Sequence, residues 1–263
     1  MLTKFGSAQF VVVSLKQGMF SKPKPLQAIG GVSLRLHKKD VLGLVGESGC
    51  GKSTLAKILL GLEQPTSGEV LVDGKEIGPA DRQLLARRIQ PIFQDPYSSL
   101  NPRKSIYDII SLPLRVHSIG DSASQRKAVK DMLDVVGLPQ RVMNTYPSQM
   151  SGGQRQRVGI ARAIALKPDF ILADEIVSGL DVSSQAQVLN LLESLVKDLG
   201  LTLAFISHDL SVIRRLCTRI LVLYKGEIVE NSETAELFAN PKADYTRTLL
   251  DAIPLPDPKQ AWL

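Results

Sequence analysis

Apolar runs of strand length alternate with segments of helical periodicity along this sequence. β-branched and other apolar residues dominate several early runs, which we predict as strands: 10–15, 32–36, 41–45, 69–72 and 89–93. Asp73-Gly74 is typical of a tight hairpin turn. Apolar positions at helical spacing predict a helix over residues 52–60. The first part of the chain is therefore predicted to be β-rich, with one strand that leads through a glycine-rich turn into a helix.

The middle of the chain has helical periodicity. Residues 106–137 form an amphipathic pattern with a polar break at Gly120 and Asp121, and Ser122 is the expected N-cap of the second helix. We therefore predict a separate helical lobe over residues 95–160. Beyond it, short apolar runs separated by helical stretches are typical of buried parallel strands in an α/β sheet: 170–173, 202–206 and 220–224.

Composition is that of a folded protein. A chain of 263 residues with 44% hydrophobic and 22% charged residues buries a substantial core and is unlike a disordered chain. Its apolar runs fall short of the roughly 20 residues of a membrane-spanning helix, and its start lacks a signal-peptide cleavage site, so we expect it not to cross a membrane. Cys50 and Cys217 are too few for a disulfide framework, which fits a reducing cytoplasm.

The formal net charge of +6 would suit nucleic acid, an anionic membrane leaflet or phosphorylated ligands. The lysines and arginines are scattered along the chain, without the aromatic interleaving that is typical of a single-strand binder. A basic solvated surface explains the charge at least as well. We therefore expect no nucleic acid partner.

Residues 46–53 match the GxxxxGK[ST] phosphate loop, and they lie between a predicted strand and a predicted helix. Glycines let the backbone curl so that its N–H groups point at phosphate oxygens, with the positive end of the helix behind them. Lys52 would hold the β and γ phosphates, and the Ser53 hydroxyl would bind Mg²⁺. The expected nucleotide-binding residues are Gly46, Glu47, Ser48, Gly49, Cys50, Gly51, Lys52, Ser53 and Thr54.

Two carboxylates, Asp174 and Glu175, come directly after the apolar run 170–173. A buried strand end would deliver them to the phosphate loop, where Asp174 can ligate Mg²⁺ and Glu175 can orient or deprotonate the attacking water. Acidic residues also follow strands that simply meet solvent, so this interpretation depends on the phosphate loop. Together the two motifs predict a P-loop NTPase with ATP and Mg²⁺ as cofactors.

Residues 150–157, Met-Ser-Gly-Gly-Gln-Arg-Gln-Arg, open a helical segment and resemble the signature sequence of ABC ATPases. A serine and glycine backbone at a helix N-terminus form a second anion cradle, and two cradles imply two chains. The resemblance implies that the signature of one subunit closes over the nucleotide held by the other. The residues assigned to this contact in trans are Ser151, Gly152, Gly153 and Gln154.

Further residues resemble family elements in the same order along the chain. Gln94 is similar to the Q-loop glutamine, which contacts both the metal and the attacking water. Ser178 and Asp181 belong to a segment that resembles the D-loop, which reaches across the dimer. His208, after the apolar run 202–206, resembles the switch histidine, which contacts the γ-phosphate and steadies the catalytic glutamate. The resemblance thus makes Glu175, His208 and Gln94 the catalytic residues.

Some positions are ambiguous or depart from the family pattern. Phe20 lies about where the family keeps the aromatic residue on which adenine stacks, and Phe10 is the competing candidate. Ile176 stands where most members have proline, and Gly179 replaces the usual alanine of the D-loop. Neither departure removes a catalytic group, but we expect the additional glycine to loosen the loop slightly.

The resemblance covers about residues 8–240 and implies an α/β fold. Its P-loop NTPase core contains a mainly parallel sheet, with an N-terminal antiparallel β subdomain and an inserted α-helical subdomain. The corresponding division is 1–94 for the β subdomain and the first half of the core, 95–160 for the helical subdomain with the signature, 161–232 for the second half of the core and 233–263 for a C-terminal extension. The extension begins as a helical turn near Thr234 and contains Pro254, Pro256 and Pro258.

Residues 94–103 and 181–192 resemble the form seen in peptide and nickel importers. This subgroup implies an ATP-hydrolysing subunit on the cytoplasmic face of the inner membrane that drives uptake of di- or oligopeptides. The implied partners are a second ATPase subunit in a heterodimer, two transmembrane permease subunits and an extracytoplasmic solute-binding protein.

Other functions are weighed against peptide import. Import of nickel or another small solute is the alternative within the subgroup. A soluble ABC ATPase of DNA repair or translation fits less well, because such proteins usually carry two cassettes or coiled-coil insertions. A subunit that binds nucleotide without hydrolysing it is disfavoured by the presence of Glu175, Gln94 and His208.

Overall fold

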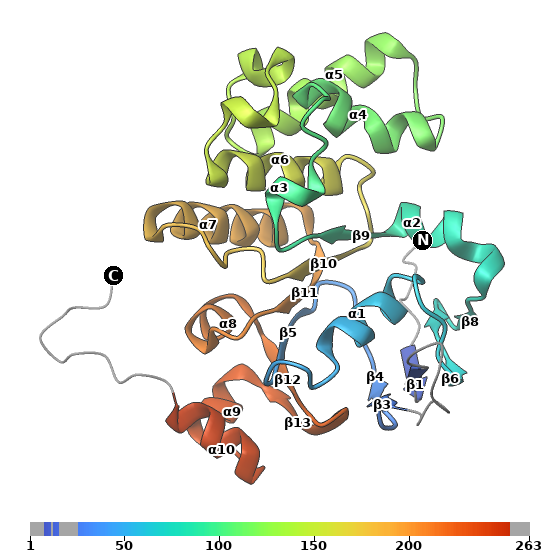
Figure 1. The fold of residues 1–263 in the computed structure, drawn as a ribbon, viewed down its shortest axis with the longest axis vertical. Helices are drawn as coiled ribbons and strands as arrows, with labels where there is room; N and C mark the ends of the chain where they lie inside the picture. Colours follow the sequence, from blue (N-terminus) through green and yellow to red (C-terminus); the bar gives the residue numbers. More distant parts are fainter. Residues whose placement is uncertain (1–7, 12, 16–25, 253–263) are drawn as a thin grey trace, which may run out of the picture.

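A six-stranded sheet organises the computed structural model, which describes residues 8–11, 13–15 and 26–252. Its strand order is β13-β12-β5-β11-β10-β9, and all neighbours except β13 and β12 run parallel (Figure 1). The strands are β5 (Val41–Val45), β9 (Ile89–Ile92), β10 (Phe170–Asp174), β11 (Thr202–Ile206), β12 (Arg219–Tyr224) and β13 (Glu227–Glu233). The predicted α/β fold with a mainly parallel sheet is confirmed.

The register of the parallel strands brings their carboxyl ends to one edge of the sheet. Asp174 pairs with Ile206, Ile206 with Leu44, and Leu44 with Leu221. The loops that follow β5, β9, β10 and β11 therefore start beside one another. In open α/β sheets, this is the edge at which ligands bind.

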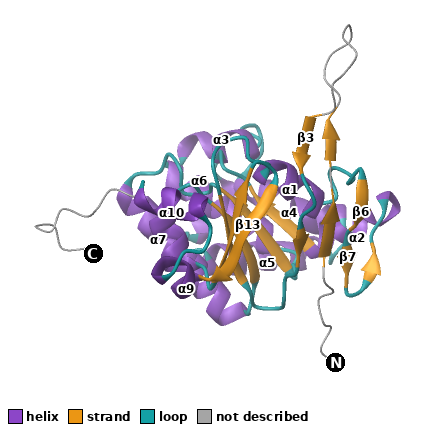
Figure 2. Ribbon diagram, turned by 90° about the horizontal axis from the view of Figure 1, so that it is seen from below, coloured by secondary structure: helices purple, strands orange, loops and turns teal. Residues whose placement is uncertain are grey.

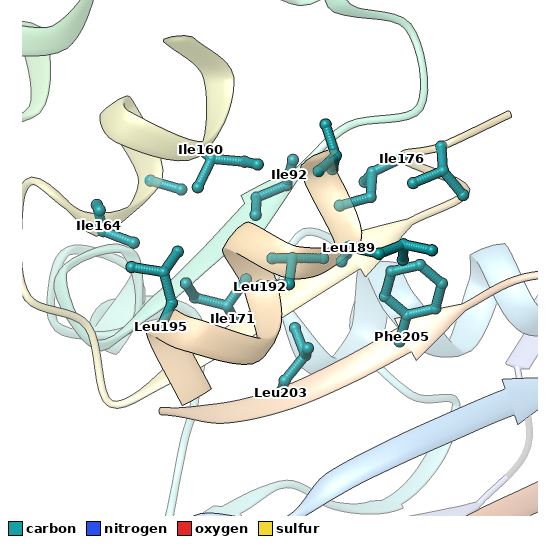
Figure 3. Close-up of a cluster of buried hydrophobic side chains, with 14 of the residues drawn as sticks. Ile92, Ile160, Ile164, Ile171, Ile176, Leu189, Leu192, Leu195, Leu203 and Phe205 are labelled. Carbon is teal, nitrogen blue, oxygen red and sulfur yellow. The ribbon is translucent and has the colours of Figure 1, made fainter. Parts of the chain in front are cut away.

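The sheet is apolar on both faces because helices cover both. Alternate residues of a strand point to opposite faces, so Leu203 and Phe205 of β11 face one hydrophobic core and Ala204 and Ile206 face another. The α7-side core includes residues of α6, α7 and α8, and Figure 3 shows β11 and α6 on opposite sides of α7. The α1-side core includes residues of α1. These helices are α1 (Lys52–Leu59), α6 (Gly152–Ile164), α7 (Val182–Leu199) and α8 (Leu210–Leu216).

A helical region extends the α7 side of the molecule (Figure 1). It contains α3 (Pro96–Ser99), α4 (Ile106–Val116), α5 (Ser122–Val135) and α6, and short 3₁₀ turns connect α5 to α6. The break predicted at Gly120 and Asp121 separates α4 from α5. The predicted N-cap at Ser122 is wrong by one residue: the Asp121 carboxylate accepts the Ser124 N–H at 2.9 Å and caps the helix.

Short antiparallel strands lie on the α1 side (Figure 2). β1 (Ala8–Val11) pairs with β4 (Ser33–Leu34) and β6 (Ser67–Glu69), β2 (Val13–Leu15) pairs with β3 (Leu26–Ile29), and β7 (Leu71–Val72) pairs with β8 (Lys75–Glu76). The runs 10–15 and 69–72, predicted as single strands, are therefore each divided between two sheets, and the run 32–36 is a strand only at Ser33–Leu34. The residue types of a run indicate that it can form a strand, but the neighbouring strand with which it pairs determines where the strand ends. The hairpin turn at Asp73-Gly74 is confirmed, with both φ angles positive.

The helix α2 (Arg82–Arg88) precedes β9. Two further helices, α9 and α10, follow β13 at the end of the described chain. The predicted helical turn at Thr234 is α9 (Thr234–Ala239), and α10 (Asp244–Asp251) was not predicted. The proline-rich segment at Pro254, Pro256 and Pro258 lies outside the described residues. Within the described ranges, no helix combines the length and apolar composition needed to cross a membrane. The division into domains stays a prediction, and its boundary at residue 160 falls inside α6.

Candidate active site

The phosphate-loop motif lies at the carboxyl edge of the sheet, between β5 and α1. Gly46 has a φ of 150°, and a Cβ there would collide with the carbonyl oxygen of Leu223. Gly51, the N-cap of α1, has a φ of 110°, and its Cβ would lie 2.6 Å from the carbonyl oxygen of Ala28. No side chain caps this helix end. The backbone N–H groups of its first turn are therefore free to bind an anion.

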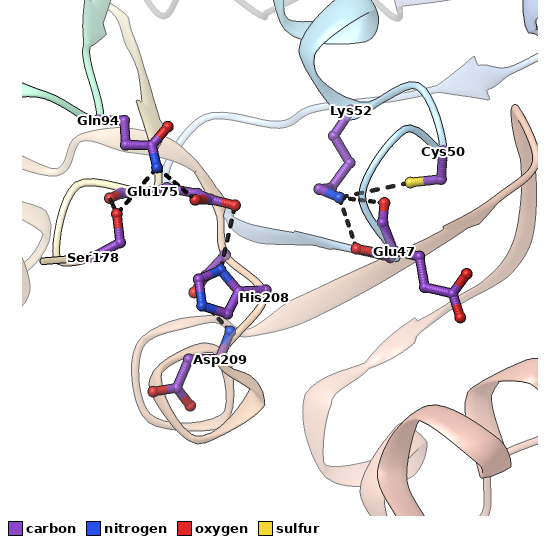
Figure 4. A network of polar contacts seen from close by, with 10 residues as sticks. Glu47, Cys50, Lys52, Gln94, Glu175, Ser178, His208 and Asp209 are labelled. Carbon is purple, nitrogen blue, oxygen red and sulfur yellow. Dashed lines mark hydrogen bonds and ion pairs between the residues drawn. The ribbon is translucent and has the colours of Figure 1, made fainter. Parts of the chain in front are cut away.

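Lys52 is the first residue of α1, and its side chain is 9% exposed. Its ammonium group donates hydrogen bonds to the carbonyl oxygens of Gly46 at 2.7 Å and Glu47 at 2.8 Å, and lies 3.7 Å from the Cys50 sulfur (Figure 4). The amine is thereby held within the loop. A cation beside the uncapped N–H groups at the start of α1 is suited to a polyphosphate.

A second group of polar side chains surrounds Glu175 (Figure 4). The Gln94 amide donates to its carboxylate at 2.9 Å and to the Ser178 hydroxyl at 3.3 Å. On the other side, Nδ1 of His208 lies 3.3 Å from the second carboxylate oxygen. The structure therefore brings together four of the predicted site residues, which come from loops after β9, β10 and β11. A carboxylate fixed from both sides can orient and deprotonate a water molecule.

The backbone of Glu175 adopts a left-handed conformation with a φ of 47°. Such a conformation costs about 1–3 kcal/mol for a residue with a side chain, and it occurs often at functional sites. Here the Glu175 N–H donates to the carbonyl oxygen of Ile206 at 2.9 Å, which ties the strained residue to the end of β11. The strain turns the chain away from the strand direction immediately after Asp174.

Asp174 carries a poorly compensated charge. Burial raises the pKa of this carboxyl, the neighbouring Glu175 raises it further, and Lys52 lowers it by less. A hydroxyl from Ser53, the Asp174 carboxylate and the amide oxygen of Gln94 are the oxygen donors that Mg²⁺ prefers. Among the described residues, no group of three or more His, Cys, Asp or Glu could hold a metal ion. The donors, of which only one is a carboxylate, fit Mg²⁺ that completes its shell with phosphates and water.

The signature motif caps α6 in a capping box. The Ser151 hydroxyl accepts the Gln154 N–H at 3.3 Å, and the Gln154 side chain accepts the Ser151 N–H at 3.0 Å. A Cβ on Gly153 would lie 2.9 Å from the Ser184 hydroxyl, so the motif packs closely on the start of α7. Asp181 caps α7 by accepting the Ser184 N–H at 2.9 Å. The signature and D-loop segments are thus neighbours within one chain.

The signature does not share a core with the phosphate loop. Apolar residues of α6 belong to the α7-side core, whereas those of α1 belong to the α1-side core across the sheet. Gly179 has a φ of 77°, a conformation that glycine adopts readily and alanine only with strain. Ile176 is buried, at 1% exposed. Phe20 lies outside the described residues, and the backbone of the competing Phe10 is part of β1.

Two contacts of this region were not predicted from sequence. The hydroxyl of Tyr245 accepts the backbone N–H of Glu47 in the phosphate loop at 2.9 Å. The guanidinium of Arg155, only 5% exposed, lies 3.6 Å from the ring centre of Tyr97 and links α6 to α3. Neither pair forms a local motif, because the partners are far apart in sequence.

A family model described as ABC transporter matches residues 29–178. The chain is 48% identical over 249 residues to the oligopeptide transport ATP-binding protein OppF of Bacillus subtilis (strain 168), covering 93% of this chain and 82% of the relative. It is 48% identical to OppF of Escherichia coli (strain K12), covering 95% of this chain and 76% of the relative. The putative peptide import ATP-binding protein BOV_A0347 of Brucella ovis is also 48% identical, over 89% of this chain and 74% of its own. The chain therefore belongs to the ABC transporter family.

Solved structures agree with this assignment. CbiO1 of Clostridium perfringens, part of the ABC transporter complex cbiONQ, matches with a TM-score of 0.75 and 27% identity over 89% of this chain and 92% of its own. The ATP-binding cassette MJ0796, solved as a dimer in a post-hydrolysis state with ADP and Pi, matches with a TM-score of 0.74 and 30% identity, over 88% of this chain and 98% of its own. The predicted ABC ATPase fold and ATPase activity are confirmed.

The uncompensated charge of Asp174 has a consequence for stability. A raised pKa means that folding disfavours the ionised carboxyl, so the charge costs stability at neutral pH. Asp174→Asn is therefore expected to raise the free energy of unfolding by about 0.5–2 kcal/mol in urea titrations without nucleotide or divalent cations. The gain should shrink as the pH falls and Asp174 itself becomes protonated. Asp169→Asn serves as the matched control and should destabilise instead, because Asp169 pairs with Arg88 at 2.6 Å. A lower stability of Asp174→Asn at neutral pH would contradict the electrostatic explanation.

Proposed function

We propose that this chain is the ATP-hydrolysing subunit of an importer that takes up di- or oligopeptides. The observation that carries the proposal is the 48% identity, over 93% of the chain, to a protein named for oligopeptide transport. A further relative of equal identity is named for peptide import. The residues around the phosphate loop and Glu175 supply the machinery that such a subunit needs.

In the proposed reaction, Glu175 orients and deprotonates the water that attacks the terminal phosphate of ATP. Gln94 and His208 hold its carboxylate from two sides, at 2.9 and 3.3 Å. Lys52 leaves the loop carbonyls to bind the phosphates, together with the N–H groups at the start of α1. When bound, Mg²⁺ would supply positive charge that neutralises the phosphate oxygens. Ser53 and Asp174, with Gln94, are the residues that would hold it.

We propose that hydrolysis takes place at the interface of two ATPase subunits. The support is structural: the phosphate loop and the signature lie at the ends of helices from different cores, separated by the sheet. The signature residues at the start of α6 are exposed or half-exposed, with one exception, the buried Gly153: Ser151, Gly152, Gly153 and Gln154. In this proposal they close over the nucleotide of a partner subunit, and Ser178 and Asp181 face the same interface. A related cassette, MJ0796, was solved as a dimer.

The partners proposed for this subunit are a second, different ATPase subunit, two transmembrane permeases and an extracytoplasmic solute-binding protein. Exposed aromatic side chains next to Gln94 support a permease contact: Phe93 is 45% and Tyr97 65% exposed. Large apolar side chains at a surface mark docking sites when they cluster. Such a contact would place the chain peripherally on the cytoplasmic face of the inner membrane.

The role of Glu175 can be tested by a substitution that keeps its size. Glu175→Gln is expected to lower ATP turnover of the assembled transporter by about 10²–10⁴-fold, because a general base is lost, while nucleotide binding persists. Turnover is measured by phosphate release and binding with a fluorescent ATP analogue. Glu193→Gln, on the exposed face of α7 and paired with Arg215, is the control and should keep full turnover. Full activity of Glu175→Gln would remove the assignment.

The contact in trans can be tested by filling the signature cradle. Ser151→Arg is expected to lower the rate of hydrolysis by about 10²-fold or more at the site that contains the partner's phosphate loop. The larger side chain would block the anion-stabilising donors at the start of α6. Nucleotide binding by the purified variant chain should stay near that of the unaltered chain, whereas Lys52→Ala should lose it. Equal losses of binding in the two variants would place both motifs on the same nucleotide and exclude the shared interface.

The cargo can be tested in the source organism. Deleting the gene in an amino-acid auxotroph should stop growth on oligopeptides that contain the required amino acid and leave growth on the free amino acid intact. The unaltered chain should restore growth, and Glu175→Gln should not. Nickel accumulation is measured in the same strains. Loss of nickel uptake with normal peptide use would contradict the peptide proposal and favour metal import.

A further inference from the structure

The helix α10, near the end of the described chain, reaches the phosphate loop. Tyr245 lies in its first turn, and its hydroxyl accepts the backbone N–H of Glu47 at 2.9 Å, across 198 residues of sequence. Glu47 follows Gly46, where the chain leaves β5 and starts to curl. Burial raises the pKa of Tyr245, so its phenol stays neutral at physiological pH. The contact is therefore a neutral hydrogen bond to the entry of the loop.

The ring of Tyr245 is fixed by a stacking partner. Its centre lies 4.1 Å from that of Tyr224, the last residue of β12, with an interplanar angle of 29°. The turn that follows Tyr224 also contacts the loop, because the Gly226 N–H donates to the carbonyl oxygen of Cys50 at 3.0 Å. The phosphate loop is thus held at two backbone positions, Glu47 and Cys50. Both supports come from the segment after β11.

The start of α10 is anchored on β13. Glu230, only 7% exposed, accepts the backbone N–H of Lys242 at 3.1 Å and that of Ala243 at 3.0 Å. Burial raises the pKa of this carboxyl, but its backbone and side-chain hydrogen-bond donors together outweigh burial, and the pKa lies below its ordinary value. The carboxylate is therefore ionised at neutral pH and binds the two N–H groups strongly. Glu230 fixes the position from which Tyr245 reaches the loop.

We infer that Tyr245 is a positioning residue for the phosphate loop, and that α10, anchored by Glu230, braces the loop in its binding conformation. The bond uses the N–H of Glu47, which precedes the helix, and leaves the N–H groups of the first turn of α1 for a ligand. A loop held in place before the nucleotide arrives loses less conformational entropy on binding. The inference rests on the nucleotide-binding role proposed for the loop.

The test compares two substitutions that each remove one hydroxyl from the same ring stack. Tyr245→Phe keeps the stack but leaves the Glu47 N–H without its acceptor, so the dissociation constant for Mg-ATP of the full chain should rise about 3–10-fold. Tyr224→Phe is the control, because the Tyr224 hydroxyl has no hydrogen-bond partner among the described residues. Its dissociation constant should stay within about twofold of the unaltered chain. Equal affinity in Tyr245→Phe and the unaltered chain would overturn the inference.

A double-mutant cycle separates positioning from general destabilisation. Glu230→Gln should also weaken Mg-ATP binding, because Glu230 anchors the helix that carries Tyr245. The double variant Tyr245→Phe, Glu230→Gln should bind Mg-ATP no more weakly than whichever single variant binds it more weakly. Additive losses would show that the two residues act independently and would overturn the brace. If the unaltered chain bound no nucleotide, the proposed function would fall together with the inference. If the unaltered chain binds nucleotide and Tyr245→Phe binds it equally well, only the inference is rejected.

Discussion

The parallel register of β5, β10 and β11 is the constraint on which the rest of the site depends. Because Asp174 pairs with Ile206 and Ile206 with Leu44, these strands end at one level. The chain after each strand therefore emerges beside the others, and motifs more than a hundred residues apart in sequence meet at one edge. The register itself is set by burial on both faces, since a slip of one residue would exchange the residues that face the α1-side and α7-side cores.

Several features of the site destabilise the folded chain, and the two hydrophobic cores have to offset this loss of stability. Two consecutive carboxylates end a buried strand, and the second adopts a left-handed backbone conformation. Lys52 lies within its own loop and compensates Asp174 only in part. These features suit a site that binds a polyanion together with a cation. The cation would compensate the Asp174 carboxylate, and the polyanion would compensate Lys52. The apolar strands and helices around the site supply the stability that keeps such an arrangement folded.

Most of the candidate site could be predicted from sequence because each of its parts is local. A phosphate loop needs glycine and lysine at fixed spacing, and Glu175 follows a strand whose apolar run is easy to identify. What could not be predicted depends on tertiary partners. The division of residues 10–15 into β1 and β2 is decided by which strands they pair with. β13 reads Glu-Ile-Val-Glu-Asn-Ser-Glu, so its two adjacent apolar residues do not form an apolar run of strand length.

The contact between Tyr245 and the phosphate loop shows why such partners matter for function. The phosphate loop is rich in glycine, and such a loop has many conformations to lose on binding. Local sequence cannot restrict that freedom without placing side chains where the phosphates must fit. A brace from outside the motif resolves this conflict, because it holds the loop at the Glu47 N–H and leaves the N–H groups at the start of α1 for the ligand. The antiparallel edge strand β13 is suited to that purpose, since it turns the chain back from β12 and carries Glu230 to the start of α10.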